Sequence, residues 1–97
     1  MPAINVRSFS AEIKTRIAPA GRSFLAVSYS YWAKGASVGA AVTNLRKEGG
    51  TGDTLIYEVA EGSHMDSCGS ISQPAGSSWP VLVFRKKTRG SFPAEAS

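Results

Sequence analysis

The sequence has little cysteine, little histidine and no long hydrophobic run: Cys68 and His64 are the only residues of their kinds. A single cysteine excludes an intrachain disulfide framework and is typical of a reducing compartment. The apolar stretches at 24–27 and 81–84 are far shorter than the roughly 20 residues that a membrane-spanning helix needs. The first residues show no apolar signal region. We therefore expect no membrane contact and a cytoplasmic location.

Residue patterns that carry catalysis or bind metals are also scarce. His64 and Cys68 lie close together, but a structural zinc site needs four Cys or His ligands and a cysteine nucleophile needs an oriented base. The glycine-rich segment 49–54 resembles a phosphate-binding loop, yet such loops run from a strand into a helix, and here the expected order is reversed. No Gly-x-Ser-x-Gly motif occurs. We expect a protein that is not an enzyme, with no cofactor and no metal site.

Charge is distributed unevenly along the chain. Residues 1–47 contain seven Lys and Arg residues against Glu12 alone, whereas residues 48–84 contain five acidic residues and no basic one. The last segment, 85–97, is basic again. Such segregation indicates either a basic surface that meets phosphate or opposite patches that meet each other across a fold or a self-association interface.

Alternating apolar and polar residues predict strands in the first third of the chain. In residues 11–17 every even position is charged, which is typical of a half-buried strand. Pro19 and Gly21 predict a turn, and residues 23–32 again alternate, so the two segments predict a β-hairpin. Residues 3–9 predict an earlier edge strand.

A helix is predicted from Val38 to Glu48. Ser37 suits the N-cap, apolar residues recur at helical spacing, and Gly49 suits the position just past the end. The alternation of Val38, Ala40 and Val42 would also fit a strand, and Gly39 disfavours a helix, so the strand alternative stays open.

Two further strands are predicted at 54–60 and 81–87, separated by a long Gly- and Ser-rich loop at 61–78 that is either functional or mobile. The prediction is therefore one small α+β domain over 1–87, built from an antiparallel hairpin, one short helix and two more strands, with a flexible tail at 88–97. The expected core is Leu25, Val27, Tyr29, Val42, Leu45, Leu55, Tyr57, Val59, Leu82 and Phe84.

Residues 42–49, followed by a strand, resemble the end of a recognition helix and the start of a wing in winged helix-turn-helix proteins. This resemblance covers under a third of the chain. It implies a helix in the major groove, with Ser37, Thr43, Asn44, Arg46 and Lys47 as its polar contacts. The family also has two preceding helices, where residues 11–32 instead show strand alternation.

Binding is the function that these features favour. The first hypothesis is nucleic-acid binding, DNA or RNA, through a basic surface with an aromatic side chain for stacking. Its predicted residues are Lys14, Arg16, Arg22, Trp32, Arg46, Lys47, Arg85, Lys86 and Lys87. The alternative is a small protein-binding inhibitor or adaptor of the kind that mobile elements encode, and a homodimer is possible because such a domain leaves one sheet face uncovered.

Overall fold

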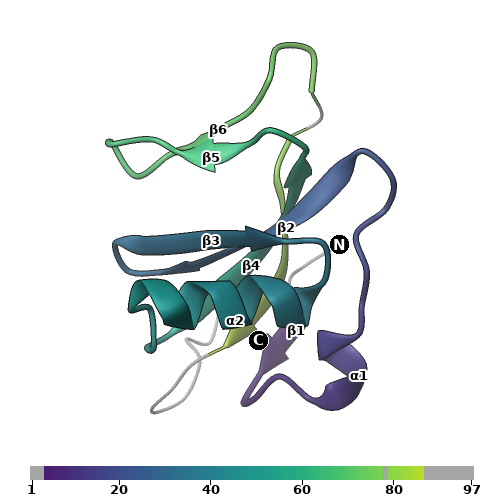
Figure 1. Cartoon of the computed structure of the whole chain (residues 1–97), viewed down its shortest axis with the longest axis vertical. Helices are drawn as coiled ribbons and strands as arrows, with labels where there is room; N and C mark the ends of the chain where they lie inside the picture. Colours follow the sequence, from purple (N-terminus) through teal and green to yellow (C-terminus); the bar gives the residue numbers. More distant parts are fainter. Residues whose placement is uncertain (1–3, 78, 87–97) are drawn as a thin grey trace.

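The first and last strands of the chain lie side by side in a sheet that a long helix covers (Figure 1). The computed structural model describes residues 4–77 and 79–86. The elements are β1 (Ile4–Val6), α1 (Ala11–Lys14), β2 (Arg22–Ser28), β3 (Tyr31–Gly35), α2 (Val38–Glu48), β4 (Thr54–Ala60), β5 (His64–Met65), β6 (Ile71–Ser72) and β7 (Val81–Lys86). The α+β class is confirmed.

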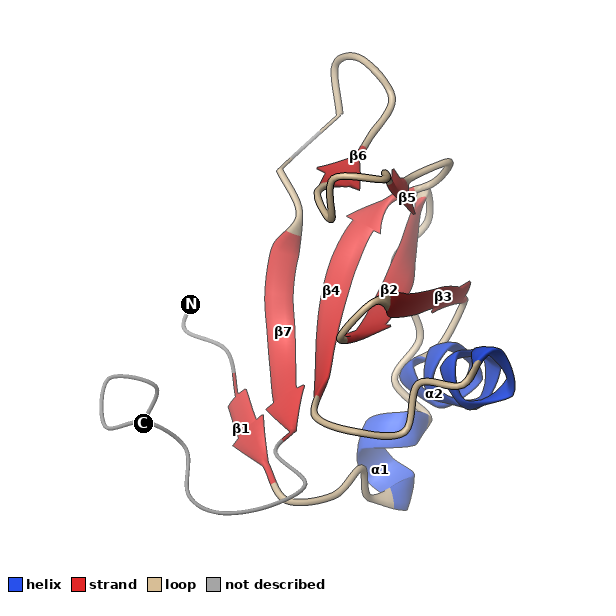
Figure 2. Cartoon of the chain, turned by 90° about the vertical axis from the view of Figure 1, so that its left-hand side faces the viewer, coloured by secondary structure: helices blue, strands red, loops and turns tan. Residues whose placement is uncertain are grey.

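The main sheet has five strands in the order β1-β7-β4-β2-β3 (Figure 2). β1 runs parallel to β7, and the other neighbours are antiparallel. β3 and β4 flank β2 and both run antiparallel to it, so the connection through α2 is a crossover between two parallel strands. The edge strand expected at 3–9 is present as the shorter β1, and the strands expected at 54–60 and 81–87 are confirmed as β4 and β7. Ala3 and Lys87 lie outside the described residues.

The strand predicted at 11–17 is wrong, because part of this segment is the short helix α1. The side chain of Ser10 accepts a hydrogen bond from the backbone N–H of Ile13, which caps the first turn. Glu12 in the first turn and Lys14 in the last complement the helix dipole. Two of the alternating charges, Glu12 and Lys14, therefore belong to one helical turn, Arg16 follows the helix, and the hairpin lies elsewhere.

The hairpin forms within the single strand that was predicted at 23–32. β2 and β3 are joined by the two residues Tyr29 and Ser30, and Ser28 pairs with Tyr31. The sequence gives little warning of this turn, since neither Gly nor Pro occurs in it. The antiparallel hairpin is thus confirmed as a motif, but its position is shifted toward the C-terminus.

Helix α2 has the predicted bounds, and the strand alternative for this segment is wrong. The Ser37 hydroxyl accepts a hydrogen bond from the backbone N–H of Ala40 at 3.1 Å. Gly49 ends the helix in the left-handed conformation, with φ of 109°. Both ends are therefore fixed by residues next to the helix in sequence.

The cap gives a direct test of this account. Ser37→Ala should lower the free energy of unfolding by about 1 kcal/mol, because the N–H of Ala40 loses its partner. Urea unfolding followed by circular dichroism measures the change. Ser8→Ala, which alters an exposed serine outside the helices, is the control and should change stability by less than about 0.5 kcal/mol. Equal effects of the two substitutions would contradict the capping role.

The core lies between α2 and one face of the sheet. Val38, Ala41, Val42 and Leu45 form the apolar stripe of α2, at the spacing expected for one helix face. They pack with a set of buried residues from the sheet and the segment before α1: Phe9, Phe24, Ala26, Ala33, Ile56 and Phe84. We call the opposite side of the sheet the open face.

The predicted core is half correct, because it mixes these two faces. Leu25, Val42, Leu45, Val59 and Phe84 are buried as expected, whereas Val27, Leu55, Tyr57 and Leu82 are half-buried. Tyr29 was placed in the core wrongly, since 78% of it is exposed. In an antiparallel sheet, paired residues share a face. The pairs Leu25–Tyr57 and Val27–Leu55 therefore put these side chains on the open face, where Leu25 is fully buried and the other three are half-buried.

Residues 61–77 leave the main sheet and form a second, two-stranded sheet from β5 and β6. This part of the long loop is ordered by Asp66, whose Oδ1 accepts hydrogen bonds from the backbone N–H groups of Cys68 and Ser70. The predicted tail at 88–97 lies outside the described residues. In the described part of the chain, no helix is long and apolar enough to cross a membrane. The winged helix-turn-helix alternative is unconfirmed. That family has two helices before the recognition helix, and within the described residues only the four-residue helix α1 precedes α2.

Candidate nucleic-acid interface

The predicted basic residues lie in several separate places. Lys14 and Arg16 are exposed at α1, and the carbonyl of Arg16 accepts a hydrogen bond from the N–H of Val38 at the start of α2. The Arg16 guanidinium lies 5.5 Å from the centre of the Phe84 ring, within the range of a cation–π contact. Arg46 is exposed in the last turn of α2, at the other end of that helix.

Arg22 connects two strands. Its Nε lies 2.8 Å from Oε1 of Glu58, and its Nη2 donates to the Glu58 carbonyl oxygen at 2.9 Å. Both side chains are largely buried, with 17% and 21% exposed. The guanidinium is therefore engaged by β4, and we leave Arg22 out of the proposed interface.

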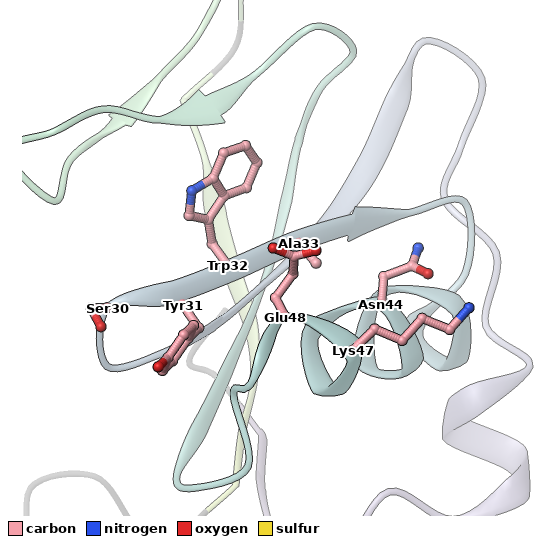
Figure 3. A pocket seen from close by; sticks show the side chains of 7 residues that line it. All are labelled: Ser30, Tyr31, Trp32, Ala33, Asn44, Lys47 and Glu48. Atoms are coloured by element: carbon pink, nitrogen blue, oxygen red, sulfur yellow. The ribbon is translucent and has the colours of Figure 1, made fainter.

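Trp32 and Lys47 line a hollow of about 430 Å³ between β3 and α2 (Figure 3). Asn44 and Glu48 of α2 and Ser30, Tyr31 and Ala33 of the hairpin complete it. The figure shows Trp32 and Tyr31 on opposite sides of β3, with Lys47 reaching along α2. We call this space the edge hollow, because β3 is the last strand of the sheet.

Arg85 and Lys86 line a second hollow of about 330 Å³ on the open face. Val27 and Leu55 contribute its apolar part, and Tyr29 and Asp53 complete it. Lys87, which the sequence predicted as the third cation of this group, lies outside the described residues. We call this space the cation hollow.

A third hollow of about 240 Å³ connects the other two. It shares Ser30, Tyr31 and Trp32 with the edge hollow, and Val27 and Tyr29 with the cation hollow. Residues Met65, Asp66, Ser67 and Gly69 from the β5–β6 segment form its outer wall. The three hollows are linked by these shared lining residues around the β3 edge, and we call their combined lining the aromatic path, which runs from Lys47 past Trp32 and Tyr29 to Arg85 and Lys86.

Carboxylates also line the aromatic path. Glu48 lies in the edge hollow beside Lys47, and Asp53 lies in the cation hollow. Asp66 lines the third hollow, so each hollow has one carboxylate. The Lys and Arg side chains lie at the two ends of the path, and the middle combines aromatic rings with Asp66 and serine side chains. This arrangement suits a ligand that alternates anionic groups with flat apolar ones.

Tyr29 lines the path although the sequence analysis assigned it to the core and chose Trp32 as the stacking residue. It lies in the two-residue turn with φ of 55°, the one described non-glycine residue with a positive φ. Its ring lies against Gly52, where an added Cβ would be 2.5 Å from Cε2 of the tyrosine. The loop predicted as a plain helix-to-strand connection thus has a second role, because its glycines give the hairpin rings room.

The other singled-out residues take structural or isolated positions. Ser37 is the α2 cap, and the Asn44 side chain donates to the Lys34 carbonyl oxygen at 2.8 Å, while Thr43 is exposed. His64 and Cys68 are exposed in the β5–β6 segment. Over residues 4–77 and 79–86, no three His, Cys, Asp or Glu side chains gather in a way that could hold a metal ion.

The comparisons with known proteins returned nothing: no protein family, no curated protein and no solved structure matches this chain.

Proposed function

We propose that this protein is a cytoplasmic, non-enzymatic binding protein that holds nucleic acid along the aromatic path. The observation that carries the proposal is the cation hollow, which Arg85 and Lys86 line together with Tyr29 and Asp53. Arg and Lys neutralise phosphates, and aromatic rings stack on bases. Lys47 and Trp32 place a cation and an aromatic residue in the lining of the edge hollow, at the other end of the path.

Salt dependence tests the proposal. Each neutralised phosphate releases counterions, so the logarithm of the affinity should fall steeply as salt rises from about 50 to 200 mM. In the double variant Arg85→Gln, Lys86→Gln, the slope of the logarithm of the affinity against the logarithm of the salt concentration should become shallower by about 1 to 2, because two phosphate contacts are lost. Fluorescence anisotropy with a labelled oligonucleotide measures both quantities.

Lys14 and Arg16 provide a matched control, because neither residue lines any of the three hollows. Lys14→Gln, Arg16→Gln removes the same charge from α1 and should leave the slope nearly unchanged. Glu48→Gln should strengthen binding, because it removes a negative charge beside Lys47. Equal losses in both double variants would contradict the path and favour a diffuse basic surface. Binding that does not respond to salt would sink the whole proposal.

One observation favours a protein partner as the second candidate. Because Ser28 and Tyr31 close a two-residue turn, the alternation of an antiparallel ladder directs the backbone N–H and C=O of Trp32 away from β2. These groups lie at the edge of the sheet, where an extended peptide or a second copy of the chain could add a strand. A partner captured by the purified protein that persists through nuclease and moderate salt would favour this adaptor or inhibitor function.

A further inference from the structure

We propose that the nucleic acid held on the aromatic path is single-stranded and that one of its bases stacks on the ring of Tyr29. This inference rests on the proposed function and adds to it the strandedness of the ligand and the residue that selects it. It starts from the conformation of Tyr29, which nothing in the core or the sheet requires.

Tyr29 occupies a backbone position that normally belongs to glycine. A positive φ at the first of two central turn residues, and not at the second, is the pattern of a type II′ turn, where Gly is preferred. A side chain with Cβ is disfavoured there. The ring recovers little by burial, because 78% of the residue is exposed. A strained and exposed aromatic residue is a sign of function, since selection for stability alone would remove it.

The surroundings of the ring hold it in place. The Tyr29 ring packs against Gly52, with Cε2, Cδ2 and Cζ all within 3.4 Å of where a Cβ would stand at that position. The neighbouring Tyr31 ring packs in the same way against Gly49, where an added Cβ would be 3.2 Å from Cε1. Both rings of the hairpin are thus supported by the α2–β4 loop. A ring that is already positioned loses little conformational entropy when a base stacks on it.

The neighbours of Tyr29 indicate what stacks there. Arg85 and Lys86 line the same hollow as the ring, so a phosphate next to a stacked base would meet positive charge. Trp32 lines the connecting hollow and offers a second ring along the path. In a duplex the base faces are stacked on one another inside the helix, and a protein ring can reach them only in unpaired strands. The geometry therefore selects single strands.

Tyr29→Gly is the sharpest variant, because it removes the ring and suits the turn. We expect it to weaken binding to an oligothymidylate of about 15 nucleotides by roughly tenfold or more, the usual loss for one stacked base. The midpoint of thermal unfolding should stay the same or rise, since the strain is relieved. A residue with a merely structural role would not give lower affinity together with undiminished stability. Tyr29→Phe keeps the ring and should bind like the unchanged protein.

Two controls separate stacking from phosphate binding. Trp79→Ala removes an aromatic residue that is 87% exposed and lies outside the lining of the path, so it should leave affinity unchanged. A duplex of the same length should bind the unchanged protein more weakly than the single strand does, and Tyr29→Gly should abolish that preference.

The outcomes distinguish this inference from the proposed function. If Tyr29→Gly binds the single strand as tightly as the unchanged protein while the Arg85 and Lys86 variant loses salt dependence, stacking on Tyr29 is wrong and nucleic-acid binding stands. If the unchanged protein prefers the duplex, the selection of single strands is wrong. If neither nucleic acid binds at low salt, both proposals fail together.

Discussion

Replacing Phe24 with alanine is expected to lower the free energy of unfolding by about 3–5 kcal/mol. Phe24 has no exposed surface and packs in the core between α2 and the sheet. Truncating it removes apolar contacts and leaves a cavity that its neighbours fill only partly. The total free energy of unfolding of a small domain is about 5–15 kcal/mol, so the Phe24→Ala variant should be barely stable. Urea unfolding followed by circular dichroism measures the loss.

A pair of leucines provides the control for this prediction. Leu45 of α2 is 1% exposed, whereas Leu55 is half-buried on the open face. Leu45→Ala should therefore lower the free energy of unfolding by about 2–5 kcal/mol, and Leu55→Ala should lower it by clearly less. If Leu55→Ala were the more damaging of the two, the open face would be the true core and the placement of the aromatic path would be wrong.

Among substitutions that add a single methyl group, Gly35→Ala is expected to destabilise the protein most. It should lower the free energy of unfolding by about 3 kcal/mol, which is the upper end of the usual cost of overpacking. Gly35 ends β3 where α2 crosses it. A Cβ at this position would overlap the backbone N of Ala41 and lie 2.7 Å from the backbone C of Ala40. Both atoms belong to the helix backbone and cannot move aside alone. The helix would have to shift away from the sheet.

Gly52→Ala is the matched control. Its added Cβ would also be too close to another group, but that group is the exposed ring of Tyr29 and not helix backbone, so the ring can give up its contact with residue 52 while the backbone stays in place. We expect this variant to lose much less stability than Gly35→Ala. The measurement is the midpoint of urea unfolding for both variants under the same conditions. A stable Gly35→Ala protein would contradict the close packing of α2 on β3.

The elements that local sequence determines were predicted well. Helix α2 begins and ends at the predicted residues because Ser37 and Gly49 fix its ends through contacts with their own neighbours in the chain. The strands β4 and β7 follow from short apolar runs bounded by Gly, Ser or Pro. Each of these signals lies within a few residues of the structure that it specifies, so no knowledge of the fold is needed to interpret it.

The wrong predictions arose where two local signals compete. Residues 11–17 have the alternation of a strand, but the Ser10 cap and the helix-compatible order of charges prevail in α1. Residues 23–32 read as one strand because the turn at Tyr29 and Ser30 has the composition of a strand. The contact of Tyr29 with Gly52 accompanies this turn in the fold, and that contact joins residues far apart in sequence.

The sequence was enough to predict which types of residue form the candidate site, but not where these residues lie relative to one another. Sequence alone gave the excess of Lys and Arg, the aromatic residues among them and the α+β class. Tertiary structure decided that Arg22 pairs with Glu58, that Arg85 and Lys86 line a hollow that Lys14 and Arg16 do not, and that Trp32 lines two hollows. The physical reason is the pairing of strands. Register fixes which side chains share a face, and it is set by contacts between distant segments.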